Sequence, residues 1–286
     1  MRTECIDFAF LDSGTGGIPY MLALKEKQPA ARCIYLGDTA HFPYGEKAPE
    51  AVTACAAHTI GAIIQKWQPR TIVIACNTIS VTSLADLRAL FPHTPIVGTV
   101  PAIKLAAERT HNKRIGLLAT NATVQHPYCA HLVHDFASDC AVFSRGDPDL
   151  VAFVEHSLFS ADAAARRAAV MPAVQYFLDN GCDTIILGCT HFTHIARDIA
   201  LAAGDGVQVV DSREGVANQA IRVEARQLPS SGAPCSLSAA SSAVVSTGVL
   251  PADKTFFVTA CTEQQLLEYE TLCENLHIPF GGVLQL

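Results

Sequence analysis

The segment at residues 70–78 reads RTIVIACNT, and the segment at residues 183–191 reads DTIILGCTH. Each is a run of β-branched and other apolar residues that ends in a small residue, a cysteine and a polar residue. Such a run is typical of a buried strand in a parallel sheet, whose carboxyl end carries the polar side chains. The match predicts that Cys76 and Cys189 occupy equivalent positions in two similar halves of the chain.

Seven further runs of the same kind flank these two, and stretches with helical spacing separate them. They are CIDFAFLD (5–12), RCIYLGD (32–38), TPIVGT (94–99), RIGLLAT (114–120), CAVFS (140–144), VQVVDS (207–212) and KTFFVTA (254–260). Alternating strands and helices of this kind predict an α/β fold with doubly wound parallel sheets. We expect two similar domains related by pseudo-twofold symmetry, with the active site between them.

The first predicted domain comprises residues 1–98 together with 212–286, and the second comprises residues 99–211. The stretch at 227–246 is rich in Ser, Pro and Ala, and it predicts a long surface loop. After this loop, KTFFVTA and the helical pattern TEQQLLEYETLCENLHI indicate that the chain returns to the first domain as its last layer.

Composition and charge exclude several classes of protein. The chain has 286 residues, half of them apolar, and a net charge of -7 without any block of Lys and Arg. A nucleic-acid partner is therefore not expected. The N-terminus reaches an aspartate too soon for a secretory signal, and no apolar run approaches the roughly 20 residues of a spanning helix. We expect a cytoplasmic protein without membrane contact.

Eleven cysteines are present, an odd number, and none of them forms a CxxC pair. This pattern argues against a disulfide framework and against a zinc ribbon, so most of these cysteines are expected to be small buried apolar residues. Two pairs of histidines have i, i+3 spacing, His131 with His134 and His191 with His194. Neither has an obvious Cys or carboxylate to complete a metal site, and no metal is expected.

Cys76 and Cys189 differ from the other cysteines because each ends a predicted strand and precedes a predicted helix. A helix N-terminus favours the thiolate, so we expect the pKa of both thiols to fall from about 8.5 toward neutrality. A thiol that titrates near neutral pH can either take or give a proton. Asn77, Thr78 and Thr190 follow the two cysteines and are expected to donate neutral hydrogen bonds to a substrate carboxylate.

Other strand ends carry further candidates. Asp12 precedes a glycine-rich turn, Ser13 to Gly17, which lacks the third glycine of a dinucleotide site and the lysine of a P-loop. Asp12 is better suited to an ammonium group or an activated thiol than to a phosphate. Tyr44 and Gly45 lie in the segment GDTAHFPYGE, which can present a phenol and backbone amides to a carboxylate.

The motifs DSGTGG, PYGE, ACNT, LLATNAT and GCTHF occur in this order, and together they resemble bacterial glutamate racemase along essentially the whole chain. The resemblance implies two α/β domains with the site between them, a homodimer, no cofactor, and the supply of D-glutamate for peptidoglycan. It also implies site roles. By motif, Cys76 and Cys189 match the catalytic thiols, Asp12 and His191 match the residues that assist them, and Glu155 matches a further active-site acid. The implied substrate contacts are Asp12, Ser13, Tyr44, Gly45, Asn77, Thr78, Thr123, Thr190 and His191.

These residues lead to a hypothesis of two bases on opposite faces of the substrate Cα. Cys76 removes the proton of D-glutamate while Cys189 returns one, and the roles reverse for L-glutamate. Asp12 is expected to serve Cys76, and His191 to serve Cys189. Alternatives remain open at this stage. The same scaffold could racemise aspartate or a hydantoin, or decarboxylate a substrate with one thiol, and a metal-binding or redox-sensing protein is a non-enzymatic alternative.

Overall fold

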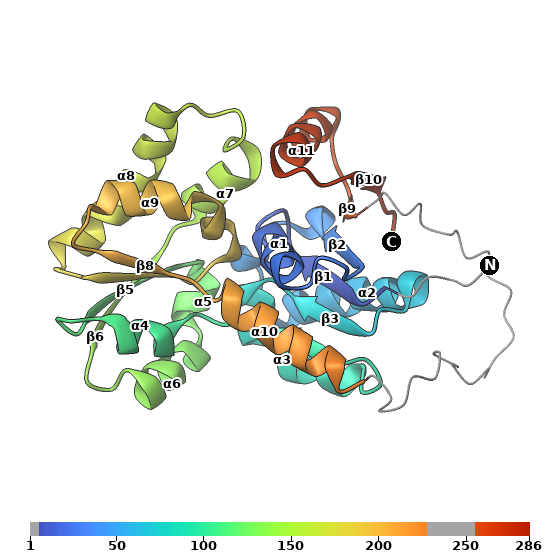
Figure 1. Ribbon diagram of the computed structural model, residues 1–286, viewed down its shortest axis with the longest axis horizontal. Coiled ribbons are helices and arrows are strands. Elements are labelled where there is room, and N and C mark those ends of the chain that lie inside the picture. Colours follow the sequence, from blue (N-terminus) through green and yellow to red (C-terminus); the bar gives the residue numbers. More distant parts are fainter. Residues whose placement is uncertain (1–5, 228–254) are drawn as a thin grey trace, which may run out of the picture.

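The computed structural model of the protein describes residues 6–227 and 255–286. Its strands form two separate parallel sheets that lie side by side (Figure 1). The loop predicted at 227–246 lies outside the described residues, apart from Gln227. Cys5 and Cys235 are also outside them, and the nine described cysteines are all free.

The first sheet has six strands in the order β10-β9-β2-β1-β3-β4. Their bounds are β1 Phe8–Asp12, β2 Cys33–Gly37, β3 Thr71–Ile74, β4 Ile96–Gly98, β9 Phe256–Val258 and β10 Phe280–Val283. Both β1 and β3 are completely buried, as expected for central strands that are covered on both faces.

The second sheet has four strands in the order β6-β5-β7-β8, namely β5 Arg114–Ala119, β6 Ala141–Gly146, β7 Thr184–Leu187 and β8 Gln208–Val210. This order repeats the β2-β1-β3-β4 part of the first sheet, with β5 in the place of β1 and β7 in the place of β3. The predicted likeness of the two halves therefore appears as a shared strand order. Cys76 follows β3 and Cys189 follows β7, so the two cysteines lie at equivalent strand ends.

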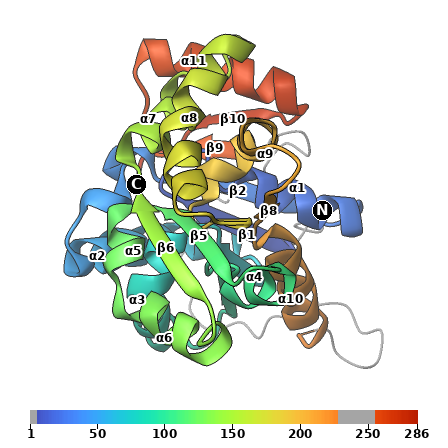
Figure 2. The same ribbon diagram turned by 90° about the vertical axis from the view of Figure 1, so that its left-hand side faces the viewer.

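Helices cover both faces of each sheet (Figures 1 and 2). Their apolar sides form one core layer on each face of each sheet. On the first sheet, one face is covered by α1, α10 and α11 and the other by α2 and α3. On the second sheet, one face is covered by α7, α8 and α9 and the other by α4 and α6. The helix bounds are α1 Ile18–Lys27, α2 Pro49–Trp67, α3 Asn77–Leu90, α4 Ile103–Arg109, α5 Asn121–Gln125, α6 Pro127–Phe136, α7 Pro148–His156, α8 Ala163–Asp179, α9 Ala196–Ala203, α10 Arg213–Ala225 and α11 Glu263–Leu276. Short 3₁₀ helices are η1 Thr39–His41, η2 Tyr44–Glu46 and η3 Thr190–Ile195.

The C-terminal segment returns to the first sheet, as its pattern predicts. Strand β9 pairs with β2, and α11 packs on the core of the same sheet. The sequence did not predict β10, because its FGGV sequence has two glycines and little β-propensity. Gly281 is required there, since a Cβ at this position would lie 2.4 Å from the ring of Phe257.

Phe256 ties this returning segment to the rest of the domain. Its ring is fully buried and lies 5.6, 5.7 and 5.4 Å from the rings of Tyr35, Tyr269 and Phe280. We predict that Phe256→Ala lowers the free energy of unfolding by about 3–5 kcal/mol, because it removes this aromatic centre and leaves a cavity. Urea unfolding at neutral pH measures the change. Leu267→Ala, on the exposed side of α11, is the control and should change stability by less than about 0.5 kcal/mol.

Candidate active site

A small, partly open cavity of about 50 Å³ lies between the two domains, at the carboxyl ends of both sheets. The first domain lines it with Asp12, Ser13, Phe42, Pro43, Tyr44, Gly45, Glu46, Cys76, Asn77 and Thr78, and the second with Thr120, Pro148, Val151, Ala152, Cys189, Thr190 and His191. Ligands of parallel α/β sheets bind at this edge because loops and helix N-termini meet there. The structure thus brings both predicted cysteines to one cavity.

The two thiols are almost completely buried, with 5% of Cys76 and 4% of Cys189 exposed. Cys76 is the N-cap residue of α3, as predicted. Cys189 differs, because the residues after it form the 3₁₀ helix η3, and the α-helix α9 begins only at Ala196. The hydroxyl of Thr193 donates to the carbonyl of Thr190 at 2.7 Å within this turn. The expectation that an α-helix follows each cysteine directly is therefore wrong for Cys189.

The prediction of a lowered pKa at Cys76 is also wrong. Burial, and then the nearby charge of Asp12, raise the pKa of this thiol well above its usual value, although the backbone N–H of Ile79 acts in the opposite direction. Desolvation of a buried thiolate outweighs the favourable end of a helix. Cys76 is consequently a thiol in this state, and its ionisation depends on what enters the cavity.

Asp12 lies beside Cys76 and joins the two domains. Its carboxylate accepts a hydrogen bond from the backbone N–H of Ser13 at 2.7 Å and another from the hydroxyl of Thr190 at 3.0 Å. Burial raises the pKa of Asp12, while the charge of His191 and the hydrogen bonds of Ser13, Cys76 and Thr190 act to lower it. A carboxyl group in this state can hold or pass a proton next to the thiol.

His191 lies beside Cys189, with 3.8 Å between Nδ1 and the sulfur. On its other side, Nε2 lies 2.9 Å from Oε2 of Glu155. Burial alone would lower the pKa of His191, but the hydrogen bonds and charges of Cys189 and Glu155 raise it well above its usual value. The pair is therefore an imidazolium and a carboxylate, and the positive ring lies beside the sulfur of Cys189.

Glu155, the further acid implied by the family resemblance, lies on α7 and is buried. Only 4% of the residue is exposed, and it does not line the cavity itself. Its Oε2 accepts hydrogen bonds from the N–H and the hydroxyl of Thr15, at 2.8 and 2.7 Å, in addition to the contact with His191. Burial acts to raise the pKa of Glu155, but the interactions with His191 and Thr15 lower it overall.

The glycine-rich turn after Asp12 packs directly on this ion pair. A Cβ at Gly14 would lie 2.6 Å from Oε2 of Glu155, and one at Gly16 would lie 2.4 Å from Nδ1 of His191. The sequence of this turn excludes a dinucleotide site and a P-loop but does not assign a role to its glycines. Its glycines allow the backbone of one domain to approach the charged pair of the other.

A group of polar side chains lies on the Cys76 side of the cavity. Both amide atoms of Asn77 are buried and have no partner among the described residues. The hydroxyl of Thr78 lies 3.1 Å from that of Thr120, which in turn donates to the hydroxyl of Thr123 at 3.0 Å. Thr120 lines the cavity, whereas the predicted Thr123 lies behind it. Thr120 could have been found in the sequence, because it directly follows a predicted strand.

Tyr44 lines the cavity, but its hydroxyl points to a buried acid. It donates to Oδ2 of Asp38, which also accepts from the hydroxyl of Thr59 at 3.1 Å. The phenol is therefore not a free donor for a substrate, contrary to the expectation from the sequence. Gly45 packs against Thr120, since a Cβ there would lie 2.8 Å from the threonine Cβ. Sequence reasoning missed the apolar wall of Phe42, Pro148, Val151 and Ala152, because such residues carry no chemical motif.

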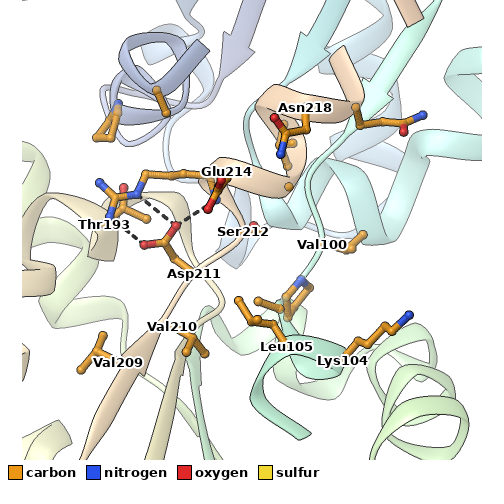
Figure 3. Close-up of a pocket in the computed structure, with 18 of the residues that line it drawn as sticks. Val100, Lys104, Leu105, Thr193, Val209, Val210, Asp211, Ser212, Glu214 and Asn218 are labelled. Carbon is orange, nitrogen blue, oxygen red and sulfur yellow. Dashed lines mark hydrogen bonds and ion pairs between the residues drawn. The ribbon is translucent and has the colours of Figure 1, made fainter. Parts of the chain in front are cut away.

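A larger groove of about 1260 Å³ also lies between the domains (Figure 3). Asp211 and Arg213 form an ion pair at its wall, with 2.7 Å between the closest atoms. No cysteine is among the residues that line this groove. The groove is larger than the cavity described above, but both candidate thiols, Cys76 and Cys189, line the smaller cavity. We therefore take the smaller cavity as the candidate active site.

Within residues 6–227 and 255–286, no group of three or more His, Cys, Asp or Glu is arranged to hold a metal ion. The paired His131 and His134 lie exposed on α6. Over the same ranges, none of the helices has the length and apolar character needed to cross a membrane.

The fold and the cavity define an α/β enzyme whose site lies between two domains and contains two thiols. The sequence model described as Asp/Glu/hydantoin racemase matches residues 21–220. The chain belongs to this family.

Named relatives and a solved structure agree with that assignment. The chain is 39% identical to a glutamate racemase of Treponema pallidum over 222 residues, which cover 78% of this chain and 82% of the relative. It is also 39% identical to a glutamate racemase of Proteus mirabilis over 208 residues, 73% of this chain and 72% of the relative. The crystal structure of Escherichia coli glutamate racemase, in complex with L-glutamate and an activator, superposes with a TM-score of 0.79 at 28% identity and covers 98% of each chain.

His194 gives a prediction about stability. Its Nε2 lies 3.1 Å from the carbonyl of Thr15, and burial lowers its pKa to about 4. In the unfolded chain His194 binds a proton near pH 6.5, whereas in the folded chain it binds one only near pH 4. Stability should fall as the pH decreases through this window, by about 1–2 kcal/mol between pH 7 and pH 5. Urea unfolding of the protein and of His194→Gln measures this, and the variant should lack that part of the pH dependence.

Proposed function

We propose that this protein interconverts L-glutamate and D-glutamate by moving protons at Cα with its own two thiols. The observation that carries the proposal is that Cys76 and Cys189 line one cavity from opposite domains. Racemisation needs a proton to leave one face of Cα and another to arrive on the opposite face. Two acid–base groups that face one substrate from two domains meet this requirement.

The proposed reaction begins when one thiolate removes the proton from Cα. The electron pair of the broken C–H bond moves toward the α-carboxylate, and the opposite thiol then gives its proton to Cα from the other face. Cys76 takes the proton from D-glutamate and Cys189 takes it from L-glutamate. Asn77, whose buried amide has no protein partner among the described residues, is placed to bind the carboxylate while its negative charge increases.

Each thiol has its own assisting groups in this proposal. Asp12 holds a proton beside Cys76, and the His191–Glu155 pair stabilises the thiolate of Cys189. Ser13, Thr78, Thr190 and the backbone of Tyr44 and Gly45 contact the substrate, with Thr123 supporting Thr120 from behind. The cavity of about 50 Å³ holds only a few waters. The domains therefore move apart to admit glutamate and close over it, which excludes water during proton transfer.

Glutamate is favoured over aspartate and hydantoins by the relatives, since those at 36–39% identity that cover most of this chain bear the name glutamate racemase. The family description itself includes all three substrate classes. We further propose that the product D-glutamate serves peptidoglycan synthesis in the cytoplasm, and that the enzyme is a homodimer. Chiral chromatography after incubation with each amino acid tests the substrate, and light scattering during gel filtration tests the assembly.

The two thiols are tested by substitution. Cys76→Ala and Cys189→Ala should each lower kcat/KM for glutamate about 10²-fold to 10⁴-fold, because each removes one of the two acid–base groups. Cys182→Ala, which changes another buried free cysteine, is the matched control and should retain activity. Circular dichroism with pure D- or L-glutamate follows the reaction. If either cavity variant racemised at the normal rate, the two-thiol scheme would be wrong.

Solvent deuterium tests the direction of proton transfer. In deuterated water, early product should carry deuterium at Cα while the remaining substrate stays unlabelled, because the proton is removed on one face and supplied on the other. Mass spectrometry of the separated enantiomers gives both values. Early deuterium in the remaining substrate would instead indicate a single base that serves both faces.

Asn77 is tested by its effect on binding. We predict that Asn77→Ala raises KM for glutamate about 10-fold to 100-fold, because a hydrogen bond to a charged group in a buried site is lost. Asn218→Ala changes an exposed amide in the larger groove and should leave KM unchanged. Initial-rate kinetics separate the two cases, and an equal effect of both variants would place the substrate outside the small cavity.

A further inference from the structure

The carboxylate of Glu155 is satisfied on one oxygen only. Oε2 receives the N–H and hydroxyl of Thr15 and lies 2.9 Å from Nε2 of His191. Oε1 is buried and has no hydrogen-bond partner within residues 6–227 and 255–286. A buried charged oxygen without a donor is costly, so the second oxygen calls for a partner.

A matching donor lies on α11, in the C-terminal segment. Tyr269 is 2% exposed, and its ring packs 5.7 Å from Phe256 and 6.2 Å from Phe280. Its hydroxyl is buried and also has no hydrogen-bond partner in the part of the chain that the structure describes. Burial and then the charge of Glu155 raise the pKa of this phenol, so Glu155 is the charge that acts on it most strongly.

The two orphan atoms are an acceptor and a donor. A side-chain hydrogen bond with Glu155 is among the causes that raise the pKa of Tyr269, which indicates that the two groups are neighbours. The phenol is too weak an acid to lose its proton here, and the carboxylate has two lone pairs to offer. The aromatic contacts fix the Tyr269 ring, and the contacts of Oε2 with Thr15 and His191 fix the carboxylate of Glu155. Figures 1 and 2 place α11 near α7, the helix that carries Glu155.

We infer that the phenol of Tyr269 donates its hydrogen to Oε1 of Glu155, and that Tyr269 is thereby a positioning residue for the His191 ring beside Cys189. The inference rests on the proposed function, because its effect is exerted on a thiol of the proposed reaction. Tyr269 touches no substrate. It acts through Glu155, which stays charged, and through His191, whose positive charge depends on that carboxylate.

Several titratable groups lie around Glu155, and among them the hydrogen bond and charge of His191 lower its pKa. The titratable groups around Glu155 are His191, His194, Tyr35, Tyr269, Glu268 and His156. His191 is the one in direct contact, and Glu268 is a second carboxylate on α11. Removing a neutral donor from Oε1 leaves these charges in place, so any effect can be assigned to the lost hydrogen bond.

Water is the competing partner for Oε1. A second cavity, of about 160 Å³, is lined by Glu155 itself and by residues near it and on α11. Its wall includes His156, Ser160, Glu268 and Thr271. This space has polar groups in its wall and is large enough for several waters. If water rather than Tyr269 satisfies Oε1, the phenol is dispensable for the charge of Glu155. The experiment below distinguishes these two partners.

The test is Tyr269→Phe, which keeps the ring and removes the hydroxyl. We expect the variant to fold, because the ring and its packing are kept, and to lose some thermal stability, because Oε1 is left without its donor. The loss of the donor makes the carboxylate of Glu155, and hence the cation of His191, less stable. The acid limb of the pH profile of kcat/KM should therefore move to higher pH by at least about 0.5 unit, because the thiolate forms less readily.

Two controls separate the hydroxyl from packing. Phe280→Leu disturbs the same aromatic cluster but keeps the phenol, so it should lower thermal stability and leave the acid limb where it is. In a Glu155→Gln background, adding Tyr269→Phe should cause no further shift, because the coupled charge is already gone.

An unchanged acid limb in Tyr269→Phe would overturn the inference and assign Oε1 to water. An equal shift in Phe280→Leu would overturn it as well, since packing alone would then explain the effect. Wild-type protein that fails to racemise glutamate contradicts the proposed function instead, and this is established before any variant is measured.

Discussion

One carboxylate oxygen, Oε2 of Glu155, holds together the parts on which the site depends. It binds the backbone and hydroxyl of Thr15 from the first domain and the imidazole of His191 from the second. The turn around Thr15 reaches this oxygen only because Gly14 and Gly16 have no side chains to obstruct it. The same contact that joins the domains thus also sets the charge and direction of the ring beside Cys189.

Much of the fold follows from local sequence, since nine expected strands are present and all pair in parallel. The features that could not be predicted depend on three-dimensional surroundings. Strand β10 forms because Phe257 packs on a glycine, and the raised pKa of Cys76 results from burial that no motif reveals. The burial of Glu155 depends on a turn 140 residues away in the chain. Candidates at or just after the ends of strands, such as Asp12, Cys76 and Cys189, line the cavity. Glu155 and Thr123 do not line it.

The two thiols share a position but not an environment. Cys76 lies beside a carboxyl group at the start of an α-helix, where burial and Asp12 favour the neutral thiol. Cys189 lies beside an imidazolium at the start of a 3₁₀ helix. The shared strand order therefore gives the two thiols similar positions, but the groups beside them differ in charge.

The repeated strand order has a consequence for how the site treats handedness. Two sheets with the order β2-β1-β3-β4 and β6-β5-β7-β8 each deliver one sulfur to the shared cavity. In the proposed reaction, the planar intermediate meets nearly the same backbone framework above and below its plane. An ordinary chiral site distinguishes mirror images because its two sides are unrelated. Here two halves of the chain with the same strand order supply related sides. The proposed site can therefore accept either mirror image of the substrate.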